Sequence, residues 1–111
     1  MIDREKFLEI RKRGESDQWT IRKIPWNKVV DLIRSQYHQK PFTVTELLKT
    51  CKAQGIEVSR LRLYHWLREQ AGIEKKKHPK VLIELFAVRY LGSWVFYYTE
   101  DPEERKQLKG L

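Results

Sequence analysis

The sequence contains a single cysteine, Cys51, and no long uninterrupted apolar run. One thiol cannot form an internal disulfide, which favours a reducing compartment. The longest apolar candidate, residues 81–88, is interrupted by Glu84 and is too short for a membrane-spanning helix. Because the first residues show no secretory apolar core, we expect a cytoplasmic protein without a membrane partner.

The sequence also lacks the spacings that bind metals or phosphates or that activate a nucleophile. Neither a Cys-x-x-Cys pair nor a His-x-x-x-His pair occurs, and no glycine-rich phosphate loop is present. The acidic residues within 100–104 fit the cap and first turn of a terminal helix better than a nuclease centre. We therefore expect no metal, no cofactor, no small-molecule substrate and no enzymatic activity. The spacing along the sequence is too wide for a shared metal site among the four candidate ligands, which are His38, Cys51, His65 and His78.

The composition is sufficient for one folded domain. Hydrophobic residues make up 41% of the 111 residues and aromatic residues 12%, so a core can form without disulfides. We expect a single domain over 1–111, with a core at 25–99, an N-terminal extension at 1–24 and a short C-terminal helix at 101–109.

Positive charge is concentrated in the middle of the chain. The net charge is +8, and residues 25–80 hold 12 basic against 5 acidic residues, whereas residues 81–111 hold 4 basic and 5 acidic. A localised basic surface attracts polyanions, and nucleic acid is the usual one. The simpler interpretation of the same charge is a surface that keeps the protein soluble.

Apolar spacing and capping residues predict three central helices. The second begins with a capping box formed by Thr43 and Glu46 and ends near Gly55. The third runs over 59–70, from the N-cap Ser59 to the stop at Gly72. The first helix follows Pro25 and carries an apolar stripe at helical spacing, formed by Trp26, Val29, Val30, Ile33 and Tyr37.

Flanking segments add short elements. A helix is expected at 3–13, a short strand at 19–24 and a very short extended piece at Phe42. Strands at 81–89 and 94–99 form a hairpin. Because Leu91 is a poor residue for a positive φ, we expect a type I turn followed by a bulge at Gly92 rather than a type I′ turn.

The order helix, short strand, helix, tight turn, helix, hairpin over 25–99 resembles the winged helix-turn-helix family. The resemblance implies an α+β fold, with a three-helix core, a C-terminal β-hairpin wing and short extra helices at both ends. It rests on Thr45-Glu46-Leu47-Leu48 in the second helix, Gly55-Ile56-Glu57-Val58-Ser59 in the turn, Leu63-Tyr64-His65-Trp66-Leu67 in the third helix, and Gly72-Ile73 before the hairpin.

The resemblance implies that helix 59–70 lies in the major groove of double-stranded DNA, as in a transcriptional regulator. With Leu63, Trp66 and Leu67 turned inward, the outer face of this helix is polar: it carries Arg60, Arg62, Tyr64, His65 and Arg68. We expect Arg60 and Arg62 to contact bases and Ser59 to contact a phosphate. Tyr64 and His65 are expected to add hydrogen bonds or contacts to the DNA backbone. The other expected phosphate contacts are Lys49, Lys52, Lys75, Lys76, Lys77 and Lys80. A solvated surface is the simpler interpretation of these cations.

The expected hairpin tip, residues 90–93, departs from a basic DNA-contacting wing. Arg89 is its only charge, while Leu91 and Trp94 are apolar. An exposed apolar tip favours a homodimer formed through the hairpin or the extra termini. The alternative function is a winged-helix module that mediates protein–protein interaction in a larger assembly.

Overall fold

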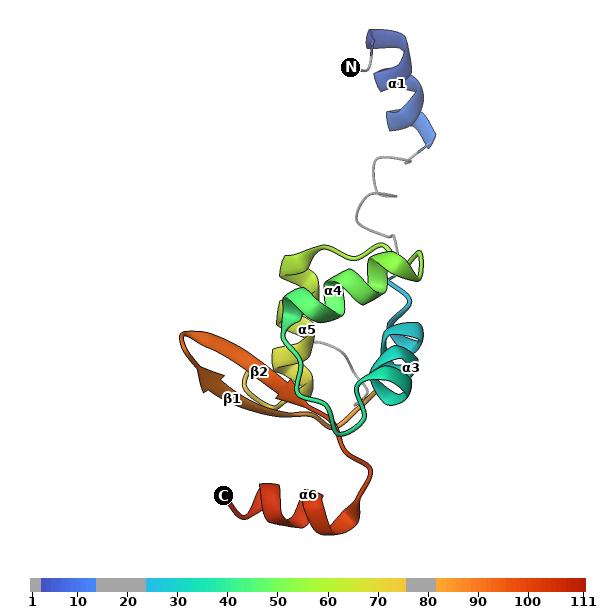
Figure 1. Cartoon of the computed structure of the whole chain (residues 1–111). Helices are drawn as coiled ribbons and strands as arrows, with labels where there is room; N and C mark the ends of the chain where they lie inside the picture. Colours follow the sequence, from blue (N-terminus) through green and yellow to red (C-terminus); the bar gives the residue numbers. More distant parts are fainter. Residues whose placement is uncertain (1–2, 14–23, 76–81) are drawn as a thin grey trace.

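The computed structural model describes residues 3–13, 24–75 and 82–111. Within these residues, four helices precede an antiparallel hairpin and one short helix follows it (Figure 1), so the expected α+β class is confirmed. The strand expected at 19–24 lies outside the described residues apart from Ile24. The elements are α1 Arg4–Arg13, α3 Trp26–Gln36, α4 Val44–Ala53, α5 Arg60–Gln70, β1 Phe86–Tyr90, β2 Ser93–Tyr97 and α6 Pro102–Lys109.

The helix ends are fixed by the capping residues that the sequence predicts. Both Gly55 and Gly72 have φ near 75°, the left-handed conformation that ends α4 and α5. At the N-termini, side-chain oxygens accept backbone N–H groups that lack an intrahelical partner. These bonds join Asp3 to Lys6 at 2.8 Å, Thr43 to Glu46 at 3.3 Å, Ser59 to Arg62 at 3.2 Å and Asp101 to Glu103 at 3.1 Å.

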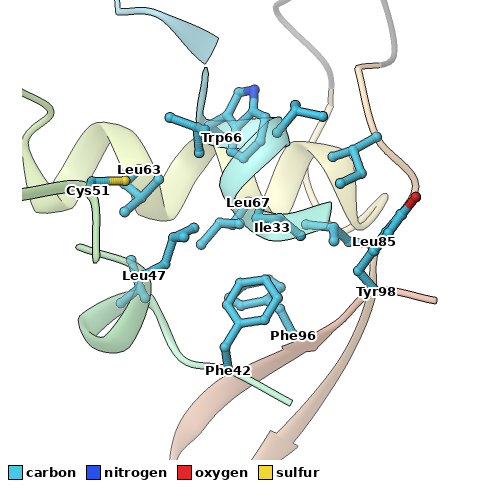
Figure 2. Close-up of a cluster of buried hydrophobic side chains, with 14 of the residues drawn as sticks. Ile33, Phe42, Leu47, Cys51, Leu63, Trp66, Leu67, Leu85, Phe96 and Tyr98 are labelled. Atoms are coloured by element: carbon cyan, nitrogen blue, oxygen red, sulfur yellow. The ribbon is translucent and has the colours of Figure 1, made fainter. Parts of the chain in front are cut away.

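One hydrophobic core joins α3, α4, α5 and the hairpin (Figure 2). The indole of Trp26 stacks on that of Trp66 with ring centroids 4.7 Å apart and planes 9° apart, which holds α3 against α5. Cys51 is buried in this core, as expected, and burial raises the pKa of its thiol. The largest fully buried side chains are Trp66, Phe42, Phe96, Ile33, Leu47, Leu63 and Leu67.

The hairpin is held to the core by alternate residues in β2 and directly after it. Phe96 and Tyr98 are buried, and the backbone of Phe42 pairs with that of Phe96 as an isolated bridge, so the extended piece expected at Phe42 is confirmed. The two strands are shorter than expected, since β1 begins at Phe86 and β2 ends at Tyr97. Ile83 and Leu85, which precede β1, are also buried in the core.

The expected type I turn with a bulge is wrong. Tyr90 pairs with Ser93, which leaves Leu91 and Gly92 as a two-residue loop. Their φ values are 50° and 79°, the positive pair that defines a type I′ turn. The backbone twist of a type I′ turn matches the twist of the two strands that it joins. To form this turn, Leu91 adopts a left-handed backbone conformation that is unfavourable for leucine.

Two sets of polar contacts hold the C-terminal elements. Oε1 of Gln70, at the end of α5, accepts the backbone N–H groups of Leu82 at 3.3 Å and Ile83 at 3.4 Å. These bonds fasten the chain that enters the hairpin to α5. In α6, Arg105 and Lys109 pair with Glu84 at 3.3 and 3.1 Å. Within the described residues, no helix is long and apolar enough to cross a membrane.

Candidate nucleic-acid interface

The exposed side of α5 carries the residues that were predicted to read DNA bases. Its inner side is formed by buried residues that include Leu63, Trp66 and Leu67, as predicted. Since successive residues turn by about 100° along a helix, the middle of the opposite side falls at Leu61, with His65 and Arg68 beside it. Leu61 is 65% exposed, and the sequence analysis did not include it because an apolar residue was not sought on a polar face.

Arg60 borders a cleft between α5 and the hairpin. Its Nη1 donates to the hydroxyl of Thr45 at the start of α4, at 2.8 Å. The cleft has a volume of about 310 Å³, and Tyr64, Ser93 and Trp94 also line it. Among the described lining residues, Arg60 is the only cation. Arg60 is thus exposed in the first turn of α5.

Arg62 lies on the opposite flank of the helix. It lines a groove of about 840 Å³ that is bounded by the start of α3 and the turn between α4 and α5. Lys28 and Lys52 line the same groove. The structure therefore does not bring Arg60 and Arg62 together, and Lys28 is a cation of this surface that the sequence analysis did not select. No local pattern marks Lys28, because it meets the other two only in the folded chain.

His65 and Arg68 are engaged within the protein. Nδ1 of His65 lies 3.0 Å from both carboxylate oxygens of Glu74, and Nη1 of Arg68 lies 3.0 Å from one of them. The guanidinium of Arg68 also lies 5.1 Å from the ring centroid of Tyr64. These two side chains were expected to be open to a partner, whereas both contact Glu74.

The remaining predicted contacts are distributed around the molecule. Lys49, Lys52 and Lys75 are exposed, whereas Lys76, Lys77 and Lys80 lie outside the described residues. Arg89 on β1 is exposed and stacks over Trp94 at 5.3 Å, with Nη2 donating to the carbonyl of Gly92 at 3.4 Å. The single cation of the hairpin tip is thus held against the inner side of the hairpin. Ser59 caps α5, and its hydroxyl hydrogen stays available to a phosphate.

The C-terminal carboxylates have structural partners. Tyr97 donates its hydroxyl to Glu104 and Tyr98 donates to Glu100, each at 2.8 Å. Burial, and then the bond to Glu104, raises the pKa of Tyr97. Across 3–13, 24–75 and 82–111, the structure contains no cluster of three or more His, Cys, Asp or Glu residues that could hold a metal ion.

Comparisons of the chain with protein-family models, with curated proteins and with solved structures gave no match. A function is therefore inferred from the arrangement of side chains on α5 and beside it.

Proposed function

We propose that this protein is a winged helix-turn-helix transcriptional regulator that binds double-stranded DNA sequence-specifically, with α5 in the major groove. The element order supports this fold, because α3, α4, the turn and α5 are followed by the β1–β2 hairpin, which corresponds to the wing. Phe42 joins the hairpin through its pairing with Phe96. A non-catalytic, binding role fits a surface that is rich in cations.

The position of Arg60 carries the proposal. It is exposed in the first turn of α5, the part of a recognition helix that reaches base edges. The hydrogen bond to Thr45 restrains its long side chain, so less conformational entropy is lost on binding. A guanidinium has five N–H donors, so one bond to Thr45 leaves enough for guanine O6 and N7.

Two neighbouring features agree with this orientation. The exposed Leu61 lies beside Arg60 and offers an apolar contact of the kind that thymine methyl groups accept. Residues 24–75 carry 9 Lys and Arg against 5 Asp and Glu. Exposed lysines such as Lys49, Lys52 and Lys75 provide the phosphate contacts that supply affinity without sequence selection.

The test is fluorescence anisotropy of labelled duplexes at two salt concentrations, after selection of a preferred site from random duplex. Arg60→Ala is expected to cost roughly 1–3 kcal/mol on the preferred site and much less on random duplex. Lys106→Ala, which removes an exposed cation of α6, is the matched control. Absence of wild-type binding at low salt, or equal losses on both duplexes for Arg60→Ala, would contradict the proposal.

The outer face of the hairpin supports a second function, protein–protein contact. Val88 is 62% exposed and Tyr90 65% exposed on the side turned away from the core. With Val95 and Leu108, Val88 lines an apolar groove of about 570 Å³ between the hairpin and α6. Residues 82–111 hold 4 basic and 5 acidic residues, so two copies can meet there with little charge repulsion. We propose a homodimer through this face.

A further inference from the structure

Three helices contribute one cation each to the groove beside the α4–α5 turn. Lys28 comes from α3, Lys52 from α4 and Arg62 from α5. All three side chains are exposed, so their charges are available to a partner. Glu57 is the only carboxylate among the described lining residues, which leaves the groove with a positive balance.

Part of the remaining lining is apolar, while Gln54 and Ser59 are polar. Pro25 borders the groove together with Ile56, which is buried, and Val58, which is half-buried. A DNA strand has a matching pattern of charged and weakly polar groups, because its charged phosphates are separated by the weakly polar faces of deoxyribose. Cations that bind phosphates and a carbon-rich floor that accepts sugars therefore fit one continuous strand.

The two arginines of the first turn of α5 must have different roles. Residues 60 and 62 are two positions apart, so their side chains leave the helix about 200° apart. Arg60 lines the cleft towards the hairpin, and Arg62 lines the groove towards α3. A duplex that meets the exposed side of α5 cannot present the floor of its major groove to both flanks.

We propose that the groove of Lys28, Lys52 and Arg62 binds the phosphate backbone of one DNA strand, and that Arg62 contacts phosphate instead of bases. Arg60 is then the base-reading arginine of the first turn. The inference rests on the proposed function and gives Arg62 a role different from the one that its sequence position suggests. The two lysines beside Arg62 support this division, since Arg60 has no second cation among the described residues that line its cleft.

The experiment measures binding of Lys28→Gln, Lys52→Gln and Arg62→Gln to preferred and random duplex across a salt series. Each variant is expected to weaken both duplexes by the same factor and to reduce the slope of log K against log salt by about 0.9. The ratio of specific to random affinity stays at the wild-type value. Arg62→Lys restores most of the salt slope because it keeps the charge. Circular dichroism verifies the fold of each variant.

Lys106→Gln is the matched control, because it removes the same charge from α6. Groove variants whose salt slopes equal that of Lys106→Gln would overturn the inference. A fall in the specificity ratio for Arg62→Gln, comparable with that for Arg60→Ala, would also overturn it. Titration with inorganic phosphate tests whether the groove binds a free anion instead of a DNA strand. If phosphate saturates the groove and DNA binding is unchanged, the groove does not bind the DNA strand. Failure of the wild type to bind any duplex would instead overturn the proposed function itself.

Discussion

The guanidinium of Arg68 lies 3.0 Å from the carboxylate of Glu74, so the protein itself neutralises a cation beside the exposed face of α5. The same carboxylate lies 3.0 Å from Nδ1 of His65. On α5 itself, the arginines outside this contact are Arg60 and Arg62, both near the start of the helix. If DNA lies along α5, Glu74 stands close to its phosphates and opposes binding.

We expect Glu74→Gln to strengthen binding to preferred and random duplex alike. Removal of one negative charge near a phosphate is worth roughly 1 kcal/mol at low salt, and the gain should shrink as salt rises. Anisotropy titrations at two salt concentrations measure it. Glu103→Gln, an equal charge change on α6, serves as the control and should have little effect. Weaker binding by Glu74→Gln would instead mean that Glu74 orients His65 and Arg68 for contact.

The hairpin turn offers a stabilising substitution. Leu91 has φ 50°, and a left-handed conformation costs an ordinary L-residue about 1–2 kcal/mol. Asparagine is favoured at this position of a type I′ turn that is followed by glycine. We therefore expect Leu91→Asn to raise the free energy of unfolding by roughly 1 kcal/mol, as measured by urea denaturation.

Leu91→Ala separates backbone strain from the loss of an exposed apolar group. Leu91 is 87% exposed, so its truncation leaves no cavity. Alanine keeps the left-handed penalty, and we expect it to leave stability almost unchanged. Equal stabilisation by the alanine and asparagine variants would show that φ at residue 91 is not the cause.

The contact between α6 and the hairpin predicts a titration. Hydrogen bonds from the hydroxyls of Thr99 and then Tyr97 lower the pKa of Glu104 below its ordinary value. A carboxylate whose pKa is lower in the folded state stabilises the fold above its unfolded pKa, and this contribution is lost as pH falls through the folded pKa. NMR titration of the Glu104 carboxyl carbon should give a midpoint below that of a model glutamate. Tyr97→Phe should raise that midpoint, and an unchanged midpoint would contradict the assigned contact.

Dimer formation through the hairpin predicts a charge-sensitive interface. Val88 is exposed, so Val88→Lys should cost little stability while it places two like charges across the proposed twofold axis. We expect the wild type to sediment as a dimer at micromolar concentration and Val88→Lys to sediment as a monomer. Ser35→Lys on α3 adds the same charge elsewhere and should remain dimeric. A monomeric wild type that still binds DNA as a monomer would exclude the dimer.

Local signals were sufficient to predict the helices. The stripe that contains Val29 and Ile33 follows from helical periodicity, and the caps at Thr43 and Ser59 act within three residues of the chain. The pairing of Glu74 with Arg68 and the joining of Lys28 to Arg62 in one groove depend on tertiary packing. Such encounters between distant residues leave no local pattern in a single sequence.

The turn was mispredicted for a tertiary reason. Local preference disfavours a positive φ at Leu91, but a shift of one residue in the strand register would turn Phe96 away from the core. Phe96 is fully buried and its backbone is paired with that of Phe42, so its position is set by the core. The burial of a large aromatic ring outweighs the strain at Leu91.

The stacked indoles of Trp26 and Trp66 give the protein an internal optical reporter. Two aromatic chromophores with centroids 4.7 Å apart and nearly parallel planes have coupled electronic transitions. Their circular dichroism and fluorescence therefore depend on the separation of α3 and α5, the two helices that also supply Lys28 and Arg62 to one groove. Any event that changes the separation of α3 and α5 would therefore change this signal in the unlabelled protein.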